Sequence, residues 1–256
     1  MVLRNIDKMY EIVEPRIQNV ERRRKDDDHF KTLDEVFDRQ TLMTIYKLIC
    51  DKVIFQLDFP VATGKEANVF KGTGRSGDIA VKIYRISTLN FKAITRYIEG
   101  DERFRVVKNK RQMMYTWAQK EYKNLLRAES ARVRAPQPIA QHRNAVVMKY
   151  IGTKSGPAKM LKDVDVEDAE RCFWKLIEMV RRLYVKGELV HCDISEYNIL
   201  WYRKTPVLID WAQAVPTTHP HAIEWLRRDV HNLLRYFSRL GVRVSGDEAE
   251  RAVMEG

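Results

Sequence analysis

The segment HCDISEYN, residues 191–198, carries the strongest indication of fold in this chain. It follows a long helical pattern and precedes a strand-like pattern that ends in IDW, residues 209–211. Together the two motifs form H-x-D-x-x-x-x-N followed by Asp210, seventeen residues after Asp193. This order of residues and elements is typical of enzymes that transfer a phosphoryl group from ATP.

The residue types in these motifs suit that chemistry. A transferred phosphoryl group is negatively charged, and Mg²⁺ or Mn²⁺ held by hard oxygen ligands offsets the charge. Asn198 and Asp210 are the predicted metal ligands. A separate carboxylate must accept the proton of the attacking hydroxyl, and we assign that catalytic role to Asp193. Any one of these residues alone is as easily explained as a turn former, so the prediction depends on the joint pattern.

A second motif lies upstream, where residues 62–69 read ATGKEANV. It matches the kinase loop G-x-G-x-x-G-x-V with only the middle glycine retained. Small residues there allow the backbone to approach phosphates. The predicted nucleotide-binding residues of this loop are Thr63, Gly64, Lys65, Glu66, Ala67, Asn68 and Val69. A Walker A loop is excluded, because no glycine stands five residues before Gly64 and Glu66 occupies the Ser/Thr position.

The third motif is AVKI, residues 80–83, which resembles the V-A-I-K strand of kinases. Lys82 is predicted to bind the α- and β-phosphates and to pair with a helix carboxylate, for which Glu121 is the candidate. Taken singly, Lys82 is equally a solvated lysine on a strand and Glu121 a surface charge. Asp229 is expected either to hydrogen-bond the 191–198 loop or to pair with neighbouring arginines.

The order of elements predicts an α+β fold with two lobes. Residues 54–84 read as strands with a turn at 72–78, residues 112–128 as a helix, and 145–151 as a buried strand. Strong helical patterns cover residues 166–186, which Gly187 is placed to end, and residues 222–239. Short strands are expected around 189–190 and 207–209. A helical pattern at residues 32–52 and a polar lead-in with the basic run Arg22–Lys25 precede them.

Composition sets wider limits. The 256 residues are 45% hydrophobic and 32% charged, with a net charge of +11 that favours acidic partners such as nucleotides or RNA. Three widely spaced cysteines form neither a disulfide framework nor a zinc pattern and fit a reducing compartment. The apolar runs are too short to span a bilayer, and the amino terminus lacks the pattern of a signal peptide. We therefore expect a cytoplasmic protein without a membrane partner.

These motifs together resemble the RIO family of atypical serine protein kinases and ATPases, and within it the first subfamily, in the form found in archaea. The loop at 63–70 is similar to that subfamily's S-T-G-K-E-A-N-V, with Ala62 in place of the serine. The segments 80–85 (AVKIYR), 100–104 (GDERF) and 189–198 (LVHCDISEYN) also resemble family segments. The resemblance covers roughly residues 32–240.

The resemblance implies a bilobal protein-kinase-like fold, β-rich in its N-lobe and α-rich in its C-lobe. It assigns residues 1–52 to a small helical extension, 53–148 to the N-lobe and 149–256 to the C-lobe, with a flexible insertion at 86–111. It places the adenine-binding hinge at Met148, Lys149 and Ile151. It also implicates Asp210 as a phosphate acceptor during ATP hydrolysis.

Three functions follow as alternatives. The first, which the resemblance favours, is an ATP- and Mg²⁺-dependent serine kinase or ATPase acting in maturation of the small ribosomal subunit. There the basic clusters 22–25 and 108–111 would contact ribosomal RNA, and the protein substrate could include the enzyme itself. The second is a small-molecule kinase of the aminoglycoside or choline type, which shares the IDW motif. The third is a non-catalytic RNA-binding scaffold, which the retention of Lys82, Asp193, Asn198 and Asp210 disfavours.

Overall fold

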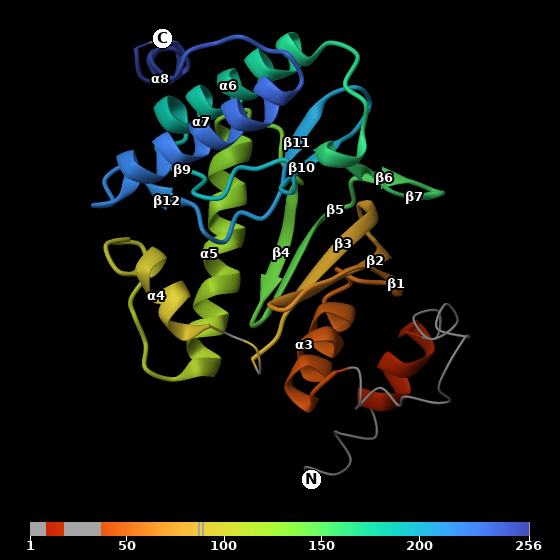
Figure 1. Cartoon of the computed structure of the whole chain (residues 1–256). Coiled ribbons are helices and arrows are strands. Elements are labelled where there is room, and N and C mark those ends of the chain that lie inside the picture. The colour runs from red at the N-terminus through yellow and green to blue at the C-terminus, as the bar shows by residue number, and fades with distance from the viewer. Residues whose placement is uncertain (1–8, 18–36, 87, 89, 256) are drawn as a thin grey trace. The chain divides into compact units, whose positions relative to one another are not determined.

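The computed structural model of the chain describes residues 9–17, 37–86, 88 and 90–255 (Figure 1). The basic run at residues 22–25 and most of the polar lead-in lie outside these ranges. Residues 9–17 are helical, in agreement with a helical lead-in. Within the described part of the chain, no helix has both the length and the apolar character that crossing a bilayer requires.

The chain divides into two compact units, and each is discontinuous in sequence. The first unit takes in residues 1–89, 109–119 and 138–150. The second takes in residues 90–108, 120–137 and 151–256. The boundaries between the lobes at residues 52/53 and 148/149 stay a prediction.

The first unit is built on a five-stranded antiparallel sheet in the order β1-β2-β3-β5-β4. Its central hairpin pairs β2 with β3 through all eight residues of each strand, from Ala67↔Tyr84 to Gly74↔Gly77. The turn is therefore shorter than the range 72–78 predicted from its turn-forming residues. Gly77, with φ of 87°, takes the left-handed conformation at the end of the turn. The strands are β1 (Gln56–Thr63), β2 (Ala67–Gly74), β3 (Gly77–Tyr84), β4 (Pro138–His142) and β5 (Ala145–Lys149).

One face of this sheet forms the core of the first unit. Its buried side chains alternate along the strands, as a period of two requires: Phe70, Ile79, Val81, Ile83, Ala145 and Val147. They pack with the apolar stripe of α3 (Arg39–Cys50), namely Leu42, Ile45, Leu48 and Ile49, and with Met9, Val13 and Ile17. The helix α3 confirms the helical pattern predicted for this region, and Asp38 caps its amino end by accepting from the Thr41 N–H at 2.7 Å.

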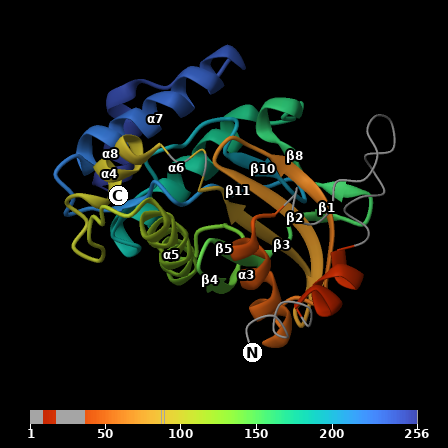
Figure 2. The ribbon, with the colours of Figure 1, turned by 90° about the horizontal axis from the view of Figure 1, so that it is seen from below.

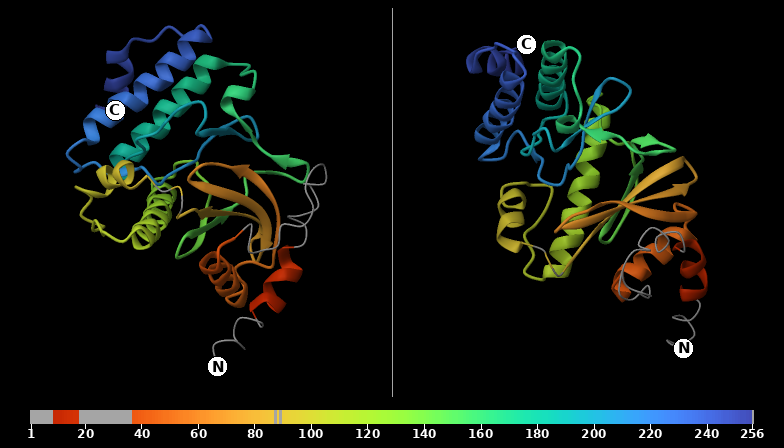
Figure 3. Two further views of the ribbon diagram at one scale, coloured as in Figure 1. Left: turned by 60° about the horizontal axis from the view of Figure 1, so that its bottom comes forward. Right: turned by 45° about the vertical axis from the view of Figure 1, so that its right-hand side comes forward.

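The second unit is mainly helical. Helices α6 (Ala169–Lys186), α7 (Ala222–Arg239) and α8 (Gly246–Met254) pack on one another, as Figures 2 and 3 show. The side chain of Asp168 caps α6, and Gly187 closes it by donating to the Arg182 carbonyl at 3.1 Å. The predicted helices 166–186 and 222–239 are thus confirmed, and α8 is an additional helix that was not predicted from the sequence.

The segment 86–111 contains more structure than the predicted flexible insertion. Residues Phe91–Ile98 form α4, which Asn90 caps by accepting from the Ala93 N–H at 3.2 Å. Ile94, Tyr97 and Ile98 form a short buried stripe, which explains why a segment with weak overall periodicity is helical. The flexibility expected of this segment stays a prediction. The helix α5 (Lys110–Ser130) follows it and confirms the helix predicted at 112–128.

Candidate catalytic site

Two loops of the second unit lie side by side because two short strand ladders bracket them. The strand β9 (Leu189–Val190) pairs with β12 (Val215–Pro216), and β10 (Ile199–Trp201) pairs with β11 (Pro206–Leu208). The loop 191–198 joins β9 to β10, and the loop 209–214 joins β11 to β12. Both loops therefore begin and end at neighbouring strands, and the sequence motifs HCDISEYN and IDW fall on them.

Hydrogen bonds within and between these loops bring together three polar side chains, those of Asp193, Asn198 and Gln213. Asn198 Nδ2 donates to the backbone carbonyl of Asp193 at 2.9 Å and to its Oδ2 at 2.8 Å. Gln213 Nε2 donates to the same Oδ2 at 3.0 Å. The Ile209 N–H donates to the Asn198 carbonyl at 3.0 Å. Asp193 and Asn198 are thus adjacent, and they are joined by Gln213, which was not predicted from the sequence.

The backbone is unusual at two positions of these loops. Cys192 has φ of 68° and Asp210 has φ of 66°, both in the left-handed region that residues with a Cβ seldom occupy. Such conformations persist where surrounding contacts hold them, and they concentrate at functional sites. Here the His191 Nε2–H donates to the Ile209 carbonyl at 3.1 Å, next to Asp210. The first bend directly precedes Asp193, and the second lies at Asp210 itself.

Asp229, on α7, holds the first of the two bends. It is fully buried, and its two carboxylate oxygens accept from the Cys192 N–H at 2.7 Å and the Ile194 N–H at 2.9 Å. Burial raises the pKa of Asp229 to about 7, against the two N–H groups and Arg228, which favour the ionised form. The first alternative predicted for Asp229, a hydrogen bond to the 191–198 loop, is confirmed.

Replacing Asp229 tests how much this support contributes to stability. In Asp229→Asn the side chain keeps an acceptor for one N–H and turns an NH₂ group toward the other, which leaves a buried donor unpaired. We expect the free energy of unfolding, measured in urea at pH 7, to fall by about 1–3 kcal/mol. The matched control is Asp165→Asn at an exposed loop position, for which no loss is expected. Equal stability of the two variants would contradict the role given to Asp229.

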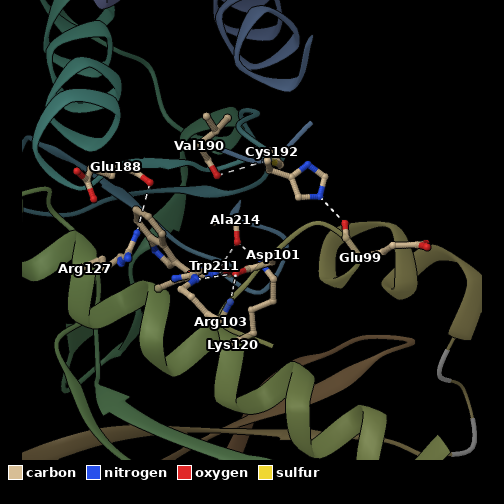
Figure 4. A network of polar contacts seen from close by, with 12 residues as sticks. Glu99, Asp101, Arg103, Lys120, Arg127, Glu188, Val190, Cys192, Trp211 and Ala214 are labelled. Atoms are coloured by element: carbon tan, nitrogen blue, oxygen red, sulfur yellow. Dashed lines mark hydrogen bonds and ion pairs between the residues drawn. The ribbon is translucent and has the colours of Figure 1, made fainter. Parts of the chain in front are cut away.

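The loop 209–214 is held in turn by side chains of α5. Asn124 Nδ2 donates to the backbone carbonyls of Trp211 and Ala214, both at 2.8 Å. Lys120 Nζ also donates to the Ala214 carbonyl (Figure 4), and Lys120 and Asn124 are both completely buried. Neither Lys120 nor Asn124 was predicted from the sequence, and Glu121, the predicted partner of Lys82, is buried on the same helix.

Lys82, in the first unit, projects from the sheet face opposite the α3 core. Residues directly opposite one another in antiparallel strands put their side chains on the same face. Lys82 pairs with Val69 on β2 and with Val146 on β5, and Ala80 pairs with Met148. These five side chains therefore share a face, and Lys82 lies there half-buried with its Nζ 5.0 Å from the ring centroid of Tyr84.

The predicted phosphate-binding loop is the exposed turn of the β1–β2 hairpin. Thr63 pairs with Asn68, and the Gly64 N–H donates to the Ala67 carbonyl at 2.9 Å. A Cβ at Gly64 would lie 3.2 Å from that carbonyl oxygen, so a side chain there would be tight. Arg85 anchors the turn by donating from its N–H to the Glu66 carbonyl and from its side chain to Asn68 Oδ1. Lys65 lies at the exposed tip.

The predicted hinge follows β5. The Tyr150 N–H donates to the Asp78 carbonyl at 3.2 Å, which makes Asp78–Tyr150 a hydrogen-bonded pair of the β3–β5 ladder. Since bonded and non-bonded pairs alternate, the N–H and carbonyl of Lys149 point away from β3. Met148 is buried and Lys149 exposed. The Ile151 carbonyl accepts from the Ala158 N–H at 3.0 Å.

The predicted site residues are divided between the units. Lys82, the 63–69 loop, Met148 and Lys149 belong to the first unit, whereas Glu121, Ile151, Asp193, Asn198 and Asp210 belong to the second. The pairing of Lys82 with Glu121 and the convergence of Lys82 with the 191–214 loops stay predictions. In the described ranges, no group of three or more His, Cys, Asp or Glu side chains is arranged to hold a metal ion.

Comparison with known proteins shows to which protein family this chain belongs. Residues 68–250 match the RIO domain family. The chain is 44% identical over 227 residues to the RIO-type serine/threonine-protein kinase Rio1 of Haloferax volcanii, covering 88% of this chain and 78% of that protein. The Rio1 kinase of Methanocaldococcus jannaschii is 42% identical over 221 residues, with 86% and 76% covered.

A solved structure has the same fold. The Rio2 kinase of Chaetomium thermophilum, in a complex described as ADP/Mg²⁺-phosphoaspartate, superposes with a TM-score of 0.65 at 24% identity, covering 84% of this chain and 67% of that one. With an antiparallel sheet in its first unit and helices in its second, the chain thus has a protein-kinase-like α+β fold. The chain belongs to the RIO family of serine/threonine-protein kinases, and its archaeal Rio1 relatives confirm the predicted subfamily.

Proposed function

We propose that the chain transfers the γ-phosphoryl group of ATP, with Mg²⁺, to a serine or threonine hydroxyl or to water. The observation that carries the proposal is the hydrogen-bonded junction of two loops, in which Asn198 and Gln213 both donate to Asp193 Oδ2 beside the bend at Asp210. The two loops carry three acidic side chains, those of Asp193, Glu196 and Asp210. The Glu196 carboxylate pairs with Arg239 at 3.0 Å, so we assign the chemistry to Asp193 and Asp210.

The nucleotide is proposed to bind to the sheet face that carries Lys82. Val69, Ala80 and Met148 supply an apolar surface for adenine beside it, and the outward-pointing carbonyl of Lys149 supplies a hydrogen-bond acceptor. The Lys82 ammonium would neutralise the α- and β-phosphates, with Glu121 as its carboxylate partner. The exposed backbone of residues 63–68 would cover the phosphates.

The donor set of the second unit fits a hard divalent cation. The amide nitrogen of Asn198 is turned toward Asp193, so its Oδ1 lies on the other side of the amide group. Oδ1 and the Asp210 carboxylate are oxygen donors of the kind that Mg²⁺ and Mn²⁺ prefer, and two protein ligands suffice when nucleotide phosphates complete the octahedron. When bound, the ion offsets phosphate charge.

Two transfer steps are open to these residues. In the kinase reaction a serine hydroxyl gives its proton to Asp193, its oxygen bonds to the γ-phosphorus, and the bond to the β-phosphate oxygen breaks to release ADP. In the ATPase reaction an Asp210 oxygen would bond to the γ-phosphorus while the bond to the β-phosphate oxygen breaks and ADP leaves, and water would then cleave the acyl phosphate to release inorganic phosphate and restore the carboxylate. The second route is supported by the phosphoaspartate that the Rio2 complex is described as containing.

An acceptor screen tests the proposal. Purified protein with Mg²⁺ and γ-labelled ATP is expected to release phosphate and to label itself or an added serine protein. Aminoglycosides and choline should not raise turnover above the level with water alone. Phosphorylated small molecule with unlabelled protein would favour the small-molecule kinase instead, and no ATP turnover with any acceptor would contradict the proposal.

We further propose a role in small ribosomal subunit maturation, in the cytoplasm. Support comes from the net charge of +11 and from the exposed cations Lys108, Lys110 and Arg111 beside the start of α5. A cationic surface of this kind attracts the RNA phosphate backbone.

The RNA proposal predicts a change in salt dependence. Lys110→Gln with Arg111→Gln should weaken binding to small-subunit ribosomal RNA, and should lower the slope of log K against log salt by about 0.7–0.9 for each RNA phosphate that the variant no longer neutralises. Lys154→Gln with Arg243→Gln removes the same charge from exposed positions elsewhere and is the control. Identical salt slopes for the two double variants, measured by filter binding, would exclude the 108–111 cluster as an RNA-binding surface.

A further inference from the structure

The GDERF motif at residues 100–104 has no role in the function proposed above, yet its aspartate is among the most buried charges of the described chain. Asp101 is 1% exposed. Arg103 clamps it with two side-chain hydrogen bonds, Nε to Oδ1 and Nη2 to Oδ2, both 2.8 Å long. Burial pushes the pKa of Asp101 upward, but these bonds and the charges of Lys120 and Arg103 outweigh it and hold the pKa below its usual range. The carboxylate is therefore ionised.

The partner of this carboxylate on α5 is Lys120. Its Nζ lies 3.5 Å from Asp101 Oδ2, and the side chains of both residues are completely buried. The same Nζ donates to the backbone carbonyl of Ala214 (Figure 4). Lys120 thus connects the GDERF motif to the loop that carries Asp210 and Gln213. Removing two charges from water costs free energy, and a protein with apolar side chains of similar volume in place of a buried ion pair is often equally stable. Stability alone therefore does not explain this pair.

The connection is reinforced next to the ion pair. The His219 Nε2–H donates to the Glu99 carbonyl at 2.7 Å, while the His219 Nδ1 accepts from the His221 N–H at 3.2 Å. Gly100 has φ of 92°, and a Cβ there would lie 2.9 Å from Pro220 Cδ. The turn at residues 99–101 is therefore pressed against the chain that follows β12, and only glycine fits at its centre.

We propose that Asp101 and Lys120 are positioning residues for the phosphoryl-transfer site. Lys120, oriented by Asp101, fixes the Ala214 carbonyl and, with Asn124, sets the path of residues 210–214. That path places the Asp210 carboxylate and directs Gln213 Nε2 to Asp193 Oδ2. This inference rests on the proposed function, because it gives these side chains a role only through Asp193 and Asp210.

The test compares two replacements of Lys120 that remove the charge. Lys120→Gln keeps an N–H donor for the Ala214 carbonyl. Lys120→Met matches the apolar stem of the lysine side chain but has no hydrogen-bond donor. If positioning is the role, kcat should fall by about 10- to 100-fold in Lys120→Met and less in Lys120→Gln, since small displacements of reacting groups reduce rates by such factors. The Mg²⁺ concentration for half-maximal rate should rise in the same order, with the dissociation constant for ADP without Mg²⁺ unchanged.

Packing alone predicts the reverse order, because Met fills an apolar site better than Gln. A Met variant that matches or exceeds the Gln variant in kcat would therefore overturn the inference. Asp101→Asn provides an independent test should Lys120→Met fail to fold: it should lower kcat, and wild-type kcat and Mg²⁺ response in that variant would also overturn it. Asp165→Asn is the charge control. If Asp193→Asn and Asp210→Asn both turn over ATP at the wild-type rate, the proposed function itself fails, which separates the two failures.

Discussion

Asp193→Asn is expected to lower kcat for phosphoryl transfer to a hydroxyl by about 10²- to 10⁴-fold, the range that a positioned general base contributes. The replacement is nearly isosteric. Its amide oxygen can still accept from Asn198 Nδ2 and Gln213 Nε2, which in the native protein both donate to Asp193 Oδ2. The loop should therefore keep its path while the proposed proton acceptor is removed.

The measurement is steady-state phosphorylation with labelled ATP, together with the dissociation constant for ATP and Mg²⁺ by calorimetry. We expect affinity to change by less than about threefold, because the proton acceptor contributes to the transition state rather than to binding. Asp165→Asn should retain wild-type kcat. An Asp193→Asn enzyme with undiminished kcat would show that Asp193 is not the base.

The second large effect is expected for Asp210→Asn. Asparagine tolerates the left-handed backbone that Asp210 adopts, so the bend at φ of 66° should survive. The variant loses the carboxylate proposed to bind the metal, and a bound metal contributes several kcal/mol to the transition state, so kcat should fall on the order of 10³-fold. The Mg²⁺ concentration needed for half-maximal rate should increase at the same time.

Asp210→Asn also separates the two transfer routes. If an acyl phosphate forms, mass spectrometry of wild-type protein quenched in acid should find an added phosphate at Asp210 that hydroxylamine removes. The Asn variant should carry none. A persistent label on serine in both proteins, with none on Asp210, would exclude the aspartyl route and leave direct transfer to a hydroxyl.

The helices that could be predicted well from the sequence have a regular apolar stripe or a clear residue at which they end. The helix α7 begins and ends at the predicted residues because its apolar stripe is regular, and α6 ends at Gly187 as predicted. The helix α4 was missed because its stripe is only three residues long. The helix α8 was missed although Ser245 and Glu248 form a capping-box pattern, and Ser245 does accept from the Glu248 N–H at 3.2 Å.

The candidate site shows the same division. Asp193, Asn198 and Asp210 could be named as candidates from the sequence because the spacing within and between two neighbouring motifs is typical of their chemistry. Lys120, Asn124 and Gln213 were not, since a lysine and an asparagine on a charged helix look like solvated residues until the 209–214 loop is seen to bury them. Their hydrogen bonds span up to 94 residues of sequence, and no local pattern encodes partners so far apart.

The central proposal is that Lys82, Asn198 and Asp210 bind one magnesium nucleotide. A crystal structure with a non-hydrolysable ATP analogue and Mg²⁺ tests it most directly. We predict Mg²⁺ about 2.1 Å from Asn198 Oδ1 and from an Asp210 carboxylate oxygen, with Lys82 Nζ about 3 Å from an α- or β-phosphate oxygen. A nucleotide bound through other residues, with the metal on neither Asn198 nor Asp210, would contradict the claim.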